Sequence, residues 1–354
     1  MYLKHFHLHE EPFATTPDPK FLYKSKVHQE ALDRIMTSVT SRRGINAIIG
    51  EPGLGKSLLI RTLLKGFSNT VRFAWVFNTT MTSRELLRYI CRDFGFKPRG
   101  EDISELLVEL YTFLIHEYEG GNYTMLIIDE AQNLKPDVLE EIRQLSNLET
   151  VSNKLLQVIL SGQPQLDTYL NDPSLIQLKQ RISLKATLHR LDYENTRHYM
   201  LHRLAVAGAK RDDIFTSAAI EAVYEISDGI PRLINQVCDN ALLTAAEEEI
   251  DLIDAVLVME MLHQGKVMSA PPPAGNTTAT PPPLPAAASS ASAPAEPVRE
   301  KNRPAVENRP APASQPAAPP WPETPRQRER EEAVLELEIA DGFDGLDLGR
   351  LSIN

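Results

Sequence analysis

One eight-residue segment constrains the fold more than any other part of the sequence. GEPGLGKS, from Gly50 to Ser57, fits G-x-x-x-x-G-K-[ST] at every fixed position, with an apolar run before it and a helical pattern after it. Such a strand, loop and helix hold a phosphate chain, because backbone N–H groups and the positive helix N-terminus face it. We therefore predict a phosphate-binding loop formed by Gly50, Glu51, Pro52, Gly53, Leu54, Gly55, Lys56, Ser57 and Leu58.

Residues 1–268 divide into two patterns. Apolar runs at 45–50, 72–78, 124–130 and 155–162 read as buried strands, and helical candidates lie at 57–67, 82–93, 103–118 and 136–148. This alternation predicts a parallel sheet covered by helices. After about Leu188 only helical patterns remain, at 192–207, 216–227, 231–248 and 251–263. The fold class expected is therefore α/β, followed by a small all-α subdomain.

The composition changes near Ser269. Residues 270–325 are rich in Pro, Ala and Ser, and such a stretch buries too little apolar surface to fold. The last 26 residues alternate acidic and apolar side chains, so they form either a disordered tail or a peptide that docks on a partner. We predict a nucleotide-binding α/β domain at 1–190, a helical lid at 191–268, a disordered linker at 269–328 and a short tail at 329–354.

Two carboxylates follow the apolar run MLII. Asp129 and Glu130 would lie at the carboxyl end of a parallel strand, where open α/β sheets bind ligands. We expect the Ser57 hydroxyl to bind Mg²⁺, Asp129 to hold the ion through water, and Glu130 to orient and polarise the attacking water. Lys56 would reach the β- and γ-phosphates. The alternative is that the two carboxylates are only solvated acids at the end of a strand. The phosphate-binding motif upstream argues against this alternative.

Further polar residues lie where they could contact a bound nucleotide. Ser161 or Gln163, at the end of the fourth strand, could contact the γ-phosphate or the water, although a plain strand-to-loop transition also explains them. Arg181 could reach the γ-phosphate of a neighbouring subunit, a surface arginine being the alternative. Arg232 lies in the first turn of a predicted helix, where a cation opposes the helix dipole, so we expect a bound anion nearby.

Bulk properties exclude some functions. The formal net charge of −11 disfavours a sequence-blind grip on nucleic acid, although basic stretches at 42–43 and 189–203 leave a local patch possible. Cys91 and Cys238 fit no metal or disulfide spacing, so two buried thiols are expected. No signal peptide and no apolar run of about 18–20 residues is present. We expect a soluble cytoplasmic protein without a transmembrane span, recruited to the inner membrane only through a partner.

Together these motifs resemble the AAA+ superfamily. Gly50–Ser57 matches Walker A, Asp129–Glu130 matches Walker B, Ser161 matches sensor 1, Arg181 the arginine finger and Gly229–Arg232 sensor 2. The resemblance implies a P-loop core with a helical lid, ATP and Mg²⁺ as cofactors, ATP hydrolysis and a homo-oligomer.

The opening of the chain is similar to a narrower family, the general secretion pathway protein A (ExeA-like) ATPases with their pilus-biogenesis and exosortase-associated relatives. The shared patterns P-F, T-P-D-P, F-L-Y and H-x-x-A-L stand at Pro12–Phe13, Thr16–Pro19, Phe21–Tyr23 and His28–Leu32. The resemblance covers about residues 1–265. It implies that Phe21, Leu22, Tyr23 and His28 line the adenine site, with packing or capping as the alternative for His28.

These observations leave three hypotheses. The first is an ATPase motor or switch for cell-envelope assembly, that is secretion, pilus or exopolysaccharide export, whose tail docks on a protein partner. The second is a DNA-associated switch that resembles the transposition-helper ATPases. The third is a nucleotide-binding adaptor with negligible turnover, against which the intact Lys56, Asp129 and Glu130 argue.

Overall fold

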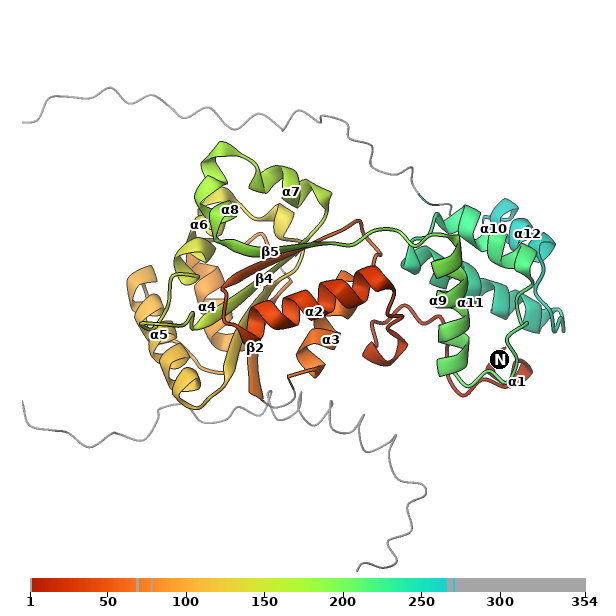
Figure 1. The fold of residues 1–354 in the computed structure, drawn as a ribbon, viewed down its shortest axis with the longest axis horizontal. Coiled ribbons are helices and arrows are strands. Elements are labelled where there is room, and N and C mark those ends of the chain that lie inside the picture. Colours follow the sequence, from red (N-terminus) through yellow and green to blue (C-terminus); the bar gives the residue numbers. More distant parts are fainter. Residues whose placement is uncertain (1, 68–69, 78, 266–269, 271–354) are drawn as a thin grey trace, which may run out of the picture. The chain divides into compact units, whose positions relative to one another are not determined.

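A parallel five-stranded sheet organises the α/β part of the chain. The computed structural model describes residues 2–67, 70–77, 79–265 and 270 (Figure 1). The strand order is β2-β3-β4-β1-β5, and every neighbouring pair is parallel. The strands are β1 (Ile45–Ile49), β2 (Val71–Val76), β3 (Tyr123–Ile128), β4 (Leu156–Gly162) and β5 (Ile182–Thr187). β1 and β4 are buried throughout, which explains why most of their residues are apolar.

Helices cover both faces of this sheet. On one face α2 (Lys26–Thr40) and α3 (Lys56–Lys65) form a hydrophobic cluster with alternate strand residues, such as Met125 and Ile127 of β3 (Figure 1). On the other face α4 (Ser83–Asp93) contacts β2, and α5 (Ile103–Glu119) contacts β3. The remaining elements of this part are α6 (Pro136–Leu145), α7 (Pro164–Leu170), α8 (Ile176–Arg181) and the 3-10 turns η1 (Pro19–Phe21), η3 (Ala131–Asn133) and η4 (Pro173–Leu175).

Four helices follow the sheet, and the start of the chain packs with them. They are α9 (Tyr193–Val206), α10 (Ser217–Ser227), α11 (Pro231–Glu247) and α12 (Ala255–His263). Their cluster includes Tyr2 from α1 (Tyr2–His5), together with Phe6, Phe13 and Phe21. Buried Arg203 of α9 donates to the carbonyls of Pro12 and Ala14 and lies 4.7 Å from the Phe21 ring. Apolar residues between Tyr2 and Phe21 thus pack in the helical cluster, whereas the domain limits at 190 and 268 stay a prediction.

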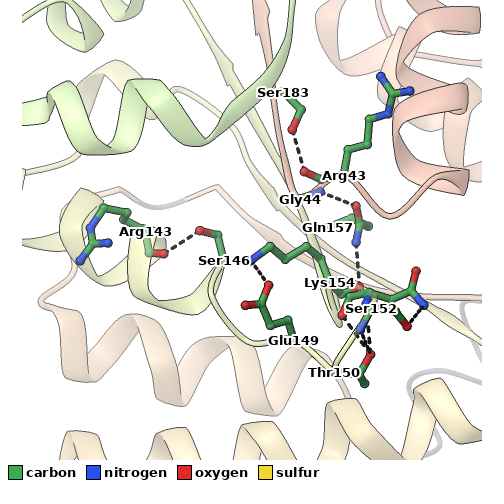
Figure 2. A network of polar contacts seen from close by, with 11 residues as sticks. Arg43, Gly44, Arg143, Ser146, Glu149, Thr150, Ser152, Lys154, Gln157 and Ser183 are labelled. Atoms are coloured by element: carbon green, nitrogen blue, oxygen red, sulfur yellow. Dashed lines mark hydrogen bonds and ion pairs between the residues drawn. The ribbon is translucent and has the colours of Figure 1, made fainter.

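A polar network fixes the amino-terminal ends of β1, β4 and β5 (Figure 2). The Gly44 N–H donates to Gln157 Oε1 at 2.9 Å, and Gln157 Nε2 donates to the Lys154 carbonyl at 3.2 Å. Ser183 Oγ donates to the Arg43 carbonyl at 2.7 Å. The carboxyl ends of the same strands form the opposite edge, which is where open α/β sheets bind ligands.

The predicted α/β fold class with a helical subdomain is confirmed, and all four predicted strands are present. β5 was not predicted, because its apolar residues alternate with exposed polar ones, as suits an edge strand. Both cysteines are free and buried, as expected. Among the described residues, no helix is long and apolar enough to cross a bilayer. Except for Ala270, the predicted linker and tail lie outside the described residues.

Candidate nucleotide-binding site

The glycine-rich loop connects β1 to α3, as the sequence predicts. Gly53 (φ +86°) and Gly55 (φ +90°) adopt left-handed backbone conformations that favour glycine. A Cβ on Gly53 would lie 2.8 Å from Cβ of Arg232, so this position also requires glycine for space. Gly55 is the N-cap of α3 and offers no capping side chain. The first N–H groups of α3 are therefore available to an anion.

Lys56 lies inside the loop. Its side chain is buried, and Nζ donates to the carbonyls of Gly50 (2.8 Å) and Glu51 (3.0 Å). Burial lowers the pKa of Lys56, while the negative charges of Glu130, Asp129 and Glu51 raise it, and burial dominates. A cation held among backbone carbonyls and carboxylates is suited to a phosphate group, which offers stronger oxygen acceptors.

Asp129 brings together residues from three separate segments. Its Oδ2 accepts a hydrogen bond from Ser57 Oγ of α3 at 2.9 Å, and its Oδ1 accepts one from Ser161 Oγ of β4 at 2.8 Å. Ser161 is fully buried and bonds this carboxylate, and its contact with phosphate or water stays a prediction. The hydroxyl and the carboxylate are the hard oxygen ligands that Mg²⁺ prefers. Within the described part of the chain, no cluster of three or more metal-ligating side chains exists. Mg²⁺ here would therefore need phosphate oxygens and water as well.

Glu130 is held by two glutamines. Its backbone is left-handed (φ 52°, ψ 39°), a conformation that costs free energy in a residue with a side chain. Glu130 Oε2 accepts hydrogen bonds from Gln132 Nε2 at 2.6 Å and Gln163 Nε2 at 2.9 Å. The Gln163 N–H in turn donates to Gln132 Oε1 at 3.1 Å. Gln163 was a candidate for the phosphate or the water; Gln132 was missed, and only its position two residues after Glu130 could have suggested it.

Arg232 contacts the phosphate loop through its backbone. Its backbone N–H donates to the Gly53 carbonyl at 3.2 Å, at the first turn of α11. The side chain is exposed, and within the described residues its guanidinium has no hydrogen-bond or ion-pair partner. A cation opposed to the helix dipole and free of a counter-charge fits the predicted bound anion.

Arg181 does not lie near its own phosphate loop. It ends α8, and the next residue, Ile182, pairs with Ile45 at the start of β1. The loop follows the other end of β1, so Arg181 lies at the opposite edge of the sheet. Its side chain is exposed. This placement excludes a contact within one chain and leaves a contact with a neighbouring subunit.

The candidates for the adenine site have contacts within the protein. His28 Nε2 lies 3.1 Å from the Leu54 carbonyl in the phosphate loop, and Nδ1 lies 2.8 Å from Ser25 Oγ. Because a carbonyl only accepts, Nε2 carries the proton and Nδ1 accepts from Ser25. Phe21 and Leu22 are buried, and Tyr23 donates to Asn195 Oδ1 at 3.0 Å.

Two of the basic residues considered for nucleic-acid binding are used inside the fold. Arg42 lies 4.8 Å from the Tyr118 ring and 4.6 Å from the Tyr123 ring, and it donates to the Asn122 carbonyl at 2.8 Å. Arg203 is buried and binds backbone carbonyls near the start of the chain. The DNA-associated hypothesis thus loses part of its basic surface.

Comparison with known proteins agrees with this geometry. Residues 39–170 match the family described as AAA domain. The chain is 40% identical over 247 residues to General secretion pathway protein A of Aeromonas hydrophila, which is 69% of this chain but 45% of that protein. The chain thus spans less than half the length of this relative.

Solved structures share the fold. The ORC2 protein of Aeropyrum pernix, in its ADPNP–ADP complexes, matches with a TM-score of 0.58 at 20% identity, covering 72% of this chain and 71% of that one. The Cdc6p protein of Pyrobaculum aerophilum matches with a TM-score of 0.53 at 20% identity, covering 68% and 67%. The comparisons confirm the expected resemblance: residues 39–170 match the AAA domain family, and the chain is similar to General secretion pathway protein A.

Proposed function

We propose that the protein binds ATP with Mg²⁺ at the phosphate loop and hydrolyses it. The observation that carries this proposal is the meeting of Lys56, Ser57, Asp129 and Glu130 at the carboxyl edge of the sheet, from two segments far apart in the sequence. An ATPase needs a phosphate cradle, a metal carboxylate and a water-orienting group close together. The AAA domain match covers these residues and supports the proposal.

Each residue has a role in this proposal. Lys56 leaves the carbonyls of Gly50 and Glu51 and neutralises charge on the β- and γ-phosphates. Ser57 and Asp129 would hold Mg²⁺, and Ser161 fixes the orientation of the carboxylate through its hydrogen bond. Bound Mg²⁺ would supply neutralisation of phosphate charge. Glu130 orients the attacking water, while its two glutamine partners fix the position of the carboxylate.

The cellular role is proposed from the relative. Similarity to General secretion pathway protein A supports an ATPase motor or switch in cell-envelope assembly, such as secretion, pilus or exopolysaccharide export. We place its action at the cytoplasmic face of the inner membrane, in a homo-oligomer, with residues 329–354 as the segment that docks on a protein partner.

ATP binding and turnover test the site directly. Glu130→Gln should still bind ATP but hydrolyse it at least about 100-fold more slowly, because water orientation and proton acceptance are lost. Lys56→Ala should lose ATP binding, whereas Lys65→Ala, at the exposed end of the same helix, should behave as wild type. Nucleotide binding by equilibrium titration and phosphate release measure the two steps. No ATP binding by wild type, or full turnover in Glu130→Gln, would contradict the proposal.

A further inference from the structure

Arg190 connects the phosphate loop to the helical subdomain. Its Nε lies 3.1 Å from both carboxylate oxygens of Glu51, and Nη2 forms an ion pair with the same carboxylate. Its Nη1 forms an ion pair with Asp228, in the turn between α10 and α11. The Arg190 side chain is 14% exposed and that of Glu51 is 23% exposed. A planar guanidinium suits this arrangement, because one edge can bind a carboxylate while another N–H reaches a second.

The backbone beside Arg190 is fixed on both sides. The Leu188 N–H donates to the carbonyl of Ile49, the last residue of β1, at 2.8 Å. The Leu191 N–H donates to the Gly229 carbonyl, beside Asp228, at 2.9 Å. The ion pairs of Arg190 therefore add to the backbone hydrogen bonds that already connect the sheet to the helical subdomain.

Glu51 puts a negative charge in a loop proposed to receive a polyanion. Its backbone carbonyl accepts a hydrogen bond from Lys56 Nζ at 3.0 Å, so Glu51 belongs to the same loop that would surround the phosphates. Without a counter-charge, Glu51 would repel ATP.

We propose that Arg190 is a positioning residue for ATP: it neutralises Glu51 in the phosphate loop and, through Asp228, fixes the turn that precedes Arg232. The proposal rests on the nucleotide site proposed above. The two carboxylates then have different effects. The charge of Glu51 changes the affinity for ATP, whereas Asp228 changes the position of Arg232 during turnover. Arg232 lies only four residues after Asp228, and its N–H is bonded to Gly53.

The test is a set of variants in the full chain, measured by Mg–ATP titration and steady-state hydrolysis. Arg190→Ala should bind ATP about tenfold more weakly than wild type, because Glu51 is no longer neutralised. Adding Glu51→Gln to Arg190→Ala should restore most of the affinity but not kcat, whereas Asp228→Asn should lower kcat severalfold and leave affinity within about twofold. Arg211→Ala, which breaks the exposed pair with Asp213, is the control for loss of an arginine.

Several outcomes would overturn the proposal. If wild type binds ATP and Arg190→Ala binds it equally well, Arg190 has no such role although the nucleotide site stands. If wild type does not bind ATP, the proposed function fails first. If Arg190→Ala loses affinity and Glu51→Gln restores none of it, the role of Arg190 is only structural. Should Arg190→Ala not fold, Glu51→Gln alone decides, since removing the carboxylate should tighten ATP binding and an equal or weaker affinity contradicts the charge balance.

Discussion

His28 is a buried titratable residue whose side chain contacts the phosphate loop. Burial lowers the pKa of His28, while its hydrogen bond to the Leu54 carbonyl opposes the shift. The unfolded chain therefore binds this proton at a higher pH than the folded protein does. Stability from this residue is complete above its unfolded pKa of about 6.5 and falls on acidification, by at most about 1.4 kcal/mol per pH unit.

We predict that the free energy of unfolding falls between pH 7.5 and pH 5.5, and falls less in His28→Gln. Glutamine keeps a donor for the Leu54 carbonyl and has no proton to gain. Burial also lowers the pKa of His202, so His202→Gln should remove a second part of the same pH dependence. Urea unfolding at both pH values measures the free energy of unfolding of wild type and each variant. An identical pH dependence in wild type and His28→Gln would show that His28 does not titrate on unfolding.

At the residue scale, sequence predicted those residues whose chemistry depends on local spacing. Lys56 and Ser57 follow from one loop pattern, and Asp129 from a strand that ends in acids. Gln132 was missed because only the placement of its side chain brings it to Glu130. Arg190 was missed because it meets Glu51 only when β1 and β5 lie side by side in the sheet. The hydrogen bond between Ser161 and Asp129 also depends on strand order, because β4 lies beside β3, and the sequence alone did not reveal it.

At the scale of elements, the turn between α10 and α11 depends on Gly229. Its φ is +70°, and a Cβ there would lie 1.8 Å from the Leu191 carbonyl oxygen, which is backbone and cannot rotate away. Gly229→Ala should therefore lower the free energy of unfolding by at least about 2 kcal/mol, more than a left-handed backbone alone costs. It should also lower kcat for ATP hydrolysis, because Arg232 follows this turn.

Gly121→Ala is the matched control. Gly121 has φ +80° and no atom within 4 Å of the added Cβ, so the substitution carries only the backbone cost, about 1–2 kcal/mol. Denaturant unfolding of both variants separates strain from collision. Equal losses in the two variants would mean that the turn moves to accommodate a side chain.

Strands were predictable from the sequence where their pattern of apolar residues was simple. The four predicted strands, β1 to β4, read as apolar runs because helices cover both faces of the sheet. β5 alternates apolar and polar residues at the edge of the sheet, and so it lacked that signature. The order β2-β3-β4-β1-β5 was beyond reach, since strand order depends on packing between distant segments.

At the scale of the whole molecule, the sheet separates Arg181 from the phosphate loop of its own chain. β1 has five residues, about 13 Å from its first to its last Cα, and Arg181 lies beside the first of them. An arginine side chain does not span that length together with the loop beyond it. If Arg181 acts in hydrolysis, it must act on a neighbouring subunit, in a head-to-tail contact that presents one edge of the sheet to the opposite edge of the next.

Mixing two inactive variants tests this geometry. Lys56→Ala should lack a working ATP site but still present Arg181, and Arg181→Ala should bind ATP but hydrolyse it about a thousandfold more slowly. In an equal mixture, sites that combine an intact loop with a neighbour's arginine should restore about a quarter of wild-type turnover, because each requirement is met half the time. Turnover should also rise with protein concentration as oligomers form. A mixture no more active than its components, or an Arg181→Ala protein with full turnover, would show that hydrolysis does not use this arginine across a subunit contact.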